Sequence, residues 1–154
     1  MRPSFSRASS GDFVSQSFPP THPLPATNGF TQPFWEACQQ RRLTFSTCRQ
    51  CGHRFLPGAP VCPQCWSGEI AASTASGTGQ VFSFAIYRRT YHPAIPAPYI
   101  IALIELDEGP RLVSNIEDCP FDQVAVGLRV QVRFDSVQGF LLPRFVPLGR
   151  RSSV

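Results

Sequence analysis

Hydrophobic and polar residues alternate along the second half of the chain with the period of two that β-strands require. In the first strand of this pattern the large apolar residues Phe82, Phe84 and Ile86 share one face. Turn sequences separate the strands, among them Asp-Glu-Gly-Pro at 107–110 and Gln-Gly at 138–139. The strands that the pattern predicts cover residues 80–87, 99–106, 111–116, 128–134 and 140–146.

The connection between the third and fourth of these strands is longer and indicates one helical turn over 120–126, which Gly127 would end. Five strands with a short helix at this place are typical of an OB-fold barrel. SH3-like barrels also have five strands but usually lack the inserted turn of helix. We therefore expect an OB-fold barrel over residues 80–147, with Pro143 and Pro147 on an edge or at a strand end.

A short amphipathic helix is predicted from Pro33 to about Arg42, where Thr31 or Gln32 can cap its start. Its apolar side is formed by Phe34, Trp35, Ala37 and Cys38. A helix of this length is not stable by itself in water. We expect it to pack on the segment that follows it or on another chain.

The regions around these elements are polar. Residues 1–30 are rich in Ser, Pro, Thr and Gly and are predicted to form a flexible arm, whose scattered phenylalanines could anchor it on a partner. Residues 71–80 have the composition of a polar linker. The expected organisation is an arm over 1–30, a helical and cysteine-rich part with its linker over 31–79, the barrel over 80–147 and a tail over 148–154.

Two pairs of cysteines, Cys48 with Cys51 and Cys62 with Cys65, are separated by ten residues. Two such CxxC turns bring four thiolates to the corners of a tetrahedron around zinc. Because four cysteines leave no open coordination position, we expect one structural zinc ion per chain. A redox dithiol needs a βαβ context, which the sequence around these turns lacks. The remaining alternatives are a site that has lost its metal and a rubredoxin-like iron site.

The residue after each CxxC turn affects its geometry. Gly52 can take the positive φ angle that such a turn needs, whereas Trp66 stands at the equivalent place of the second turn and is expected to alter the local geometry. His53 could replace a cysteine as a ligand, but four thiolates are already available.

Charge and hydropathy narrow the function classes. The net charge is +4 with no lysine, which excludes a lysine Schiff base, and the barrel segment carries six arginines against seven acids. A near-neutral barrel disfavours nucleic-acid binding. No apolar run approaches the ~18 residues that span a bilayer, and the N-terminus lacks the apolar segment of a secretory signal, so the cytoplasm is the expected location.

No catalytic motif is present among the familiar nucleotide, hydrolase and metalloprotease signatures. The available histidines are His22, His53 and His92, and the cysteines outside the zinc set are Cys38 and Cys119. No histidine is placed near Cys119 by the sequence, so it is interpreted as a small half-buried residue rather than a nucleophile.

A proline-rich loop between the first two barrel strands contains a cluster of cationic and aromatic side chains: Arg88, Arg89, Tyr91, His92 and Tyr99. Arginines suit phosphate or carboxylate groups, and aromatic rings suit stacking on a base or a partner side chain. The alternative is a solvated hairpin loop whose tyrosines cover the end of the barrel.

Several stretches in a fixed order carry a family resemblance over about residues 33–147: PFWEACQQRRLTFSTCRQCGHRFLPGAPVCPQC, GTGQVFSFAIYRRTYHP, PYIIALIELDEGPRLVSNI and VGLRVQVRF. The chain resembles the OB-fold proteins with a rubredoxin-like zinc ribbon that are associated with acyl-CoA enzymes and long carried only a domain-of-unknown-function label. The resemblance implies a mainly β protein with a short N-terminal helix, a zinc ribbon and a five-stranded OB-fold barrel.

The resemblance also implies an accessory subunit that binds a thiolase-like or lipid-transfer-protein-like enzyme, a thiolase or an aldolase, and shapes its acyl-CoA channel. Only the zinc ligands carry over residue by residue. The resemblance implies no catalytic residues. The helix around Phe34 and Trp35 and the loop from Arg88 to Tyr99 are the candidate contacts for the partner or for acyl-CoA. The alternatives are an independent acyl-CoA-binding protein and, less favoured, a single-stranded nucleic-acid binder.

Overall fold

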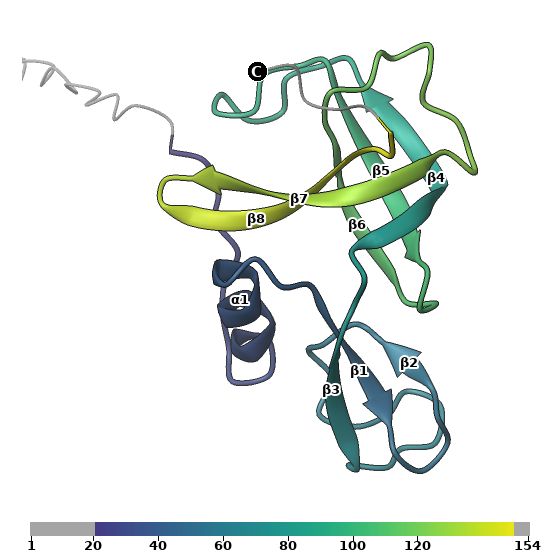
Figure 1. Ribbon diagram of the computed structural model, residues 1–154. Helices are drawn as coiled ribbons and strands as arrows, with labels where there is room; N and C mark the ends of the chain where they lie inside the picture. The colour runs from purple at the N-terminus through teal and green to yellow at the C-terminus, as the bar shows by residue number, and fades with distance from the viewer. Residues whose placement is uncertain (1–20, 150–154) are drawn as a thin grey trace, which may run out of the picture.

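The computed structural model describes residues 21–149. Residues 1–20 of the predicted arm and 150–154 of the predicted tail lie outside this range. The described elements are the helix α1 (Gln32–Gln39) and the strands β1 (Thr44–Cys48), β2 (Arg54–Phe55), β3 (Ile70–Thr74), β4 (Thr78–Tyr87), β5 (Tyr99–Leu106), β6 (Arg111–Ile116), β7 (Arg129–Val137) and β8 (Phe140–Pro147). Figure 1 shows the small sheet β1–β3 on one side of a barrel formed by β4–β8, with α1 beneath the β7–β8 hairpin.

The barrel has the strand order of an OB-fold. Its strands close in the order β4-β5-β6-β8-β7, and β6 pairs parallel with β8 while the other pairs are antiparallel. Alternate residues of β5 point into the core, so that Ile100, Ala102, Ile104 and Leu106 are all buried. The predicted fold class is therefore confirmed, and the period of two in this strand does mark its buried face.

The predicted linker over residues 71–80 is wrong. Its first part belongs to β3, which pairs antiparallel with the whole of β1, and β4 begins at Thr78. Apart from Ile70, which packs against the cluster around Cys48 and Phe55, the side chains of β3 are small or polar, and all are partly or fully exposed. Main-chain hydrogen bonds to β1 form the strand, so hydrophobic alternation gave no sign of it.

The first barrel strand contains a β-bulge that the alternation did not indicate. The register with β5 shifts between Val81 and Ser83, so Val81, and not Phe82, shares a face with Phe84. Val81 is fully buried, whereas Phe82 is 42% exposed. The Phe82 ring instead lies under the guanidinium group of Arg111, which is 3.6 Å from the ring centroid.

The helical turn predicted over residues 120–126 is absent from the described structure, where this connection contains only turns. Within it the amide of Gln123 donates to Pro120 O at 2.9 Å, which closes a single turn. Gly127 then takes a φ angle of +85°, its amide donates to Val81 O at 2.8 Å, and the amide of Val81 donates to Leu128 O at 3.0 Å. The chain therefore joins β4 soon after this turn and forms no helix.

The N-terminal helix is shorter than predicted, because it ends at Gln39 and leaves Arg41 and Arg42 beyond its last turn. Thr31 occupies the N-cap without a side-chain cap bond, and Asn28 Oδ1 accepts hydrogen bonds from the amides of Phe30 and Thr31. No helix among residues 21–149 is long and apolar enough to cross a membrane.

One hydrophobic core extends from the small sheet into the barrel. Leu43 and Phe45 of the β1 segment belong to the same buried cluster as Ile104, Val130 and Phe145 of the barrel. The segment between β3 and β4 is also tied to the barrel, since the amide of Ser76 donates to Glu108 Oε1 at 2.6 Å. The small sheet and the barrel are therefore packed as one body.

Substitution of Gly79 tests how closely β4 approaches β5 in the barrel. A Cβ atom at this position would lie 2.4 Å from Glu105 O and 3.1 Å from Leu106 Cα, which are backbone atoms that cannot rotate away. We expect Gly79→Ala to lower the free energy of unfolding by about 2 kcal/mol or more, as measured by urea unfolding. Gly68→Ala is the control, because nothing lies within 4 Å of its added Cβ. Equal stability of the two variants would contradict the close approach of β4 and β5.

Candidate functional site

The four predicted zinc ligands gather at one end of the small sheet. The Sγ atoms of Cys48, Cys51, Cys62 and Cys65 all lie within 4.8 Å of one another. The Cys48–Cys65 and Cys51–Cys62 sulfur pairs are 3.5 Å and 3.6 Å apart. Around zinc with Zn–S bonds of about 2.3 Å, tetrahedral sulfurs stand roughly 3.8 Å apart. The arrangement of the donors therefore fits a tetrahedral metal ion.

The two CxxC turns have the same backbone geometry. Gly52 donates its amide to Cys48 O at 2.9 Å, and Trp66 donates its amide to Cys62 O at 2.9 Å. Their φ angles are +73° and +63°. The alteration expected at Trp66 is therefore absent: the tryptophan adopts the left-handed conformation, and its side chain remains 77% exposed.

The electrostatics of the cluster also suit a cation. The backbone amide of Cys51 lowers the pKa of Cys48 to about 6. The backbone amide of Ser67 lowers the pKa of Cys65, but burial and the three neighbouring thiols outweigh it and raise that pKa to about 12. Four thiolates at this spacing repel one another, and a divalent cation among them would remove the repulsion.

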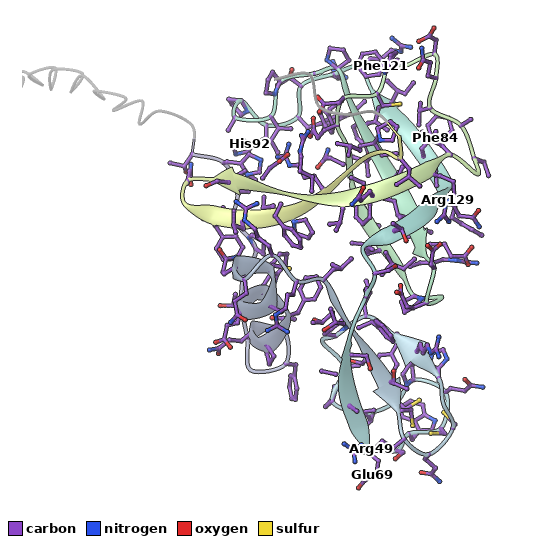
Figure 2. All side chains as sticks on the ribbon, viewed as in Figure 1. Arg49, Glu69, Phe84, His92, Phe121 and Arg129 are labelled. Atoms are coloured by element: carbon purple, nitrogen blue, oxygen red, sulfur yellow. The ribbon has the colours of Figure 1, made fainter. Side chains whose placement is uncertain are left out.

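The other candidate residues near the ribbon are not part of this set. The His53 ring stacks on Phe55 with centroids 5.7 Å apart. Cys38 is fully buried in α1, where burial raises the pKa of its thiol to about 12. Figure 2 shows Arg49 and Glu69 at the end of the ribbon farthest from the barrel. The metal cluster thus lies away from the barrel surfaces that could bind a partner.

A second candidate site is an apolar groove of about 580 Å³ on the outside of the barrel. It lies between α1, the loop before β5, and the outer faces of β6 and β8. Its walls include Phe34, Trp35, Ile95, Tyr99, Val113 and Leu142. Its volume is within the range of ligand-binding pockets, and its lining is mostly hydrophobic.

The charged groups on the β6 and β8 side of the groove already have partners. Arg144 forms an ion pair with Glu117, and the Ser114 hydroxyl donates to Pro143 O at 2.7 Å. The groove therefore offers no unpaired charge along this wall and is suited to an apolar occupant.

The structure divides the predicted contact residues into two groups. Phe34, Trp35 and Tyr99 line the groove together, although they come from distant parts of the chain. Arg88 and Arg89 follow β4, are exposed and do not line the groove.

The aromatic residues of the loop form a cluster of their own. Tyr87 stacks on Tyr99 with ring centroids 5.2 Å apart, and Tyr91 meets Tyr87 edge-on at 5.6 Å. His92 accepts a hydrogen bond from the amide of Ala94 at Nδ1 and so helps to shape the loop itself. Figure 2 shows His92 on the side of the barrel opposite Phe84. The loop is therefore an ordered wall at one end of the barrel.

The helix that forms one wall of the groove packs on the barrel strand β8 as well as on β1. The Gln39 side chain forms two hydrogen bonds with the backbone of Leu141, donating to its O at 3.2 Å and accepting from its N at 2.9 Å. The Trp35 ring lies 5.6 Å from the Phe140 ring. We expected the helix to pack on the segment that follows it or on another chain. That expectation missed the main contact, because Leu141 of β8 lies 102 positions after Gln39 in the sequence.

The remaining groove residues, among them Leu56, Val113 and Leu142, were not predicted. A signal for them does exist in the sequence. Ile100 with Ile101, and Leu141 with Leu142, are adjacent apolar pairs in strands, which put apolar side chains on both faces. Such pairs indicate that the outer face of a strand is also covered.

Comparisons with known proteins agree with this architecture. Residues 35–71 match the family model described as the ChsH2 rubredoxin-like zinc ribbon domain, and residues 72–135 match that of the ChsH2 C-terminal OB-fold domain. A DUF35 domain-containing scaffold protein of Methanothermobacter thermautotrophicus is 36% identical over 107 residues, which cover 68% of this chain and 80% of that protein.

Two further relatives are named for enzyme complexes. A probable enoyl-CoA hydratase alpha subunit of Thermomonospora curvata is 40% identical over 108 residues, which are 70% of this chain but only 34% of that protein. The chain thus spans about a third of the length of that relative. Among solved structures, a chain of the Ltp2-ChsH2(DUF35) aldolase is 37% identical with a TM-score of 0.74, and the match covers 80% of this chain and 98% of that one.

The contact between α1 and β8 can be tested with Gln39→Ala. Loss of the two hydrogen bonds to Leu141 is expected to weaken the docking by about 1 kcal/mol, which speeds amide hydrogen exchange in α1 about fivefold. Gln40→Ala is the matched control, since the Gln40 side chain bonds only to Arg42 among the described contacts. Unchanged exchange in Gln39→Ala would show that these two bonds do not hold the helix on the barrel.

Proposed function

We propose that this chain, which belongs to the DUF35 family of proteins with a rubredoxin-like zinc ribbon and an OB-fold domain, is a non-catalytic accessory subunit of an acyl-CoA enzyme. Its partner is a thiolase-like or lipid-transfer-protein-like enzyme, and the two form a hetero-oligomer. The observation that carries this proposal is the similarity to the chain of the Ltp2-ChsH2(DUF35) aldolase, which extends over 98% of that chain with a TM-score of 0.74.

The placement of the polar and apolar side chains in the described residues supports a binding role rather than a catalytic one. The histidines are spread over separate parts of the fold: His53 stacks on Phe55 in the ribbon, and His92 bonds within its own loop. Nucleophilic catalysis needs a nucleophile and a base within hydrogen-bond reach. The groove, in contrast, collects apolar side chains from three parts of the chain at one place.

In the proposed complex, the groove and the neighbouring loop face the partner and help to form its acyl-CoA channel. The apolar walls suit the acyl chain or apolar partner side chains, while Arg88 and Arg89 at the exposed end of β4 suit a CoA phosphate or a partner carboxylate. The partner supplies the catalytic residues.

The metal in this proposal is one structural zinc ion held by Cys48, Cys51, Cys62 and Cys65. Bound by four thiolates, zinc has no open position for substrate and serves to cross-link the two CxxC turns. The buried cluster around these turns is small, with Cys48, Phe55 and Cys62 at its centre. Such a core cannot hold the ribbon closed, and structural zinc contributes roughly 10–16 kcal/mol of apparent binding free energy.

The zinc proposal predicts one tightly bound zinc per chain by elemental analysis. Cys48→Ser or Cys62→Ser is expected to release the metal and unfold the small sheet, because a closed site with three thiolates is incomplete. Cys119→Ser, at a half-buried cysteine outside the cluster, is the control and should retain the zinc. Folded wild-type protein without stoichiometric zinc would contradict the proposal.

The accessory role is tested by co-expression with the thiolase-like or lipid-transfer-protein-like enzyme whose gene lies nearest in the genome. We expect a stable complex, no thiolase or aldolase turnover by this chain alone, and partner activity that depends on it. Arg88→Ala with Arg89→Ala should weaken the complex, or its affinity for acyl-CoA, by roughly 1.5–3 kcal/mol if these exposed side chains bond to charged groups there.

The control for the arginine substitutions is Arg49→Ala, which removes an exposed charge at the far end of the ribbon (Figure 2). Titration of the partner with and without acyl-CoA measures both variants. Binding of acyl-CoA by this chain alone, with no complex formed, would instead favour an independent acyl-CoA-binding protein.

A further inference from the structure

The groove on the outside of the barrel is open along one wall in the described part of the chain. Val113 on the outer face of β6 lines it and is 68% exposed, and Trp35 and Tyr99 are only partly covered. A concave, mostly apolar surface of this kind is where proteins usually bind apolar groups.

The N-terminal end of the described chain reaches this groove. His22 is one of its lining residues, so residues 1–20 start from its rim. Phe18 is four residues before His22, which in an extended chain spans at most about 13–14 Å. A side chain at position 18 is therefore within reach of the groove.

The chemistry of the adjoining segment matches the lining. Residues 13–20 read Phe-Val-Ser-Gln-Ser-Phe-Pro-Pro and carry no charge, while the charged residues Arg2, Arg7 and Asp12 all come earlier in the sequence. A phenylalanine ring buries 150–250 Å² when it is fully covered. Because Arg144 and Glu117 already pair with each other, the occupant needs no charge to match this side of the groove.

We propose that residues 13–20 of the same chain bind in this groove, with the rings of Phe18 and Phe13 as the anchors. A short tether raises the effective concentration of the segment to the millimolar order, so a weak intrinsic affinity is sufficient. The proposal stands independently of the accessory role. In the proposed complex the enzyme partner faces the same groove, so its docking has to displace this segment.

Photo-cross-linking in the full-length, zinc-loaded chain tests the occupant directly. Phe18 is replaced by the photoreactive analogue benzoylphenylalanine, the protein is irradiated at low concentration, and the cross-linked residues are mapped by mass spectrometry. We expect cross-links within one chain to groove residues such as Val113, Ile95 and Leu142.

A matched pair of substitutions gives this experiment its control. Val113 and Val126 are both 68% exposed, but only Val113 lines the groove. Val113→Asp is expected to lower the cross-link yield about fivefold or more, because Phe18 would have to desolvate the new carboxylate. Val126→Asp should leave the yield unchanged. Equal yields in both variants, or cross-links scattered over the surface, would overturn the proposal, and cross-links between two chains would assign the groove to a second copy instead.

Tryptophan fluorescence provides a second measurement. Trp66→Phe removes the exposed tryptophan and leaves Trp35 in the groove wall as the reporter. In this background, Phe13→Ser with Phe18→Ser is expected to increase acrylamide quenching of Trp35 and to shift its emission to longer wavelength, whereas Phe5→Ser should change neither. Identical quenching in all three proteins would show that the segment does not cover the groove.

Discussion

The structure depends on a single hydrophobic core that the cysteine-rich ribbon and the barrel share. Leu43 and Phe45, which precede the first metal ligand, pack in the same cluster as Val81, Leu106 and Val130 of the barrel. The ribbon has only a small cluster of its own around Cys48, Phe55 and Cys62. Its orientation on the barrel therefore follows from this common core, and its far end has little buried surface beyond this small cluster.

The position of the groove follows from this shared core. One wall comes from α1, which precedes the ribbon, another from the loop before β5, and a third from β6 and β8. These walls meet because β1 is packed against the barrel and the side chain of Gln39 binds the backbone of Leu141 on β8. A ribbon joined by a free linker would not hold α1 at this place. The groove is thus a product of packing between parts far apart in the sequence.

The division of roles within the molecule also has a physical basis. Along the β6 and β8 side of the groove, Arg144 pairs with Glu117 and the Ser114 hydroxyl donates to Pro143 O, so these side chains stabilise the surface. The sulfur cluster lies in the ribbon, where Cys48 ends the strand β1. The sulfur cluster and the apolar groove are consequently separate: one lies in the ribbon, and the other on the outer face of the barrel.

The sequence by itself determined the features that depend on local spacing. The four cysteines, the alternation of β5 and the turn at Gln138-Gly139 all follow from short-range rules, since ligand geometry and side-chain direction are set within a few residues. Tertiary structure alone decided the rest. The strand β3 exists because β1 offers it hydrogen bonds, and the bulge at Val81 and Ser83 shifts the face of Phe82. Each of these depends on a partner strand, and the identity and register of that strand are settled only when the whole barrel closes.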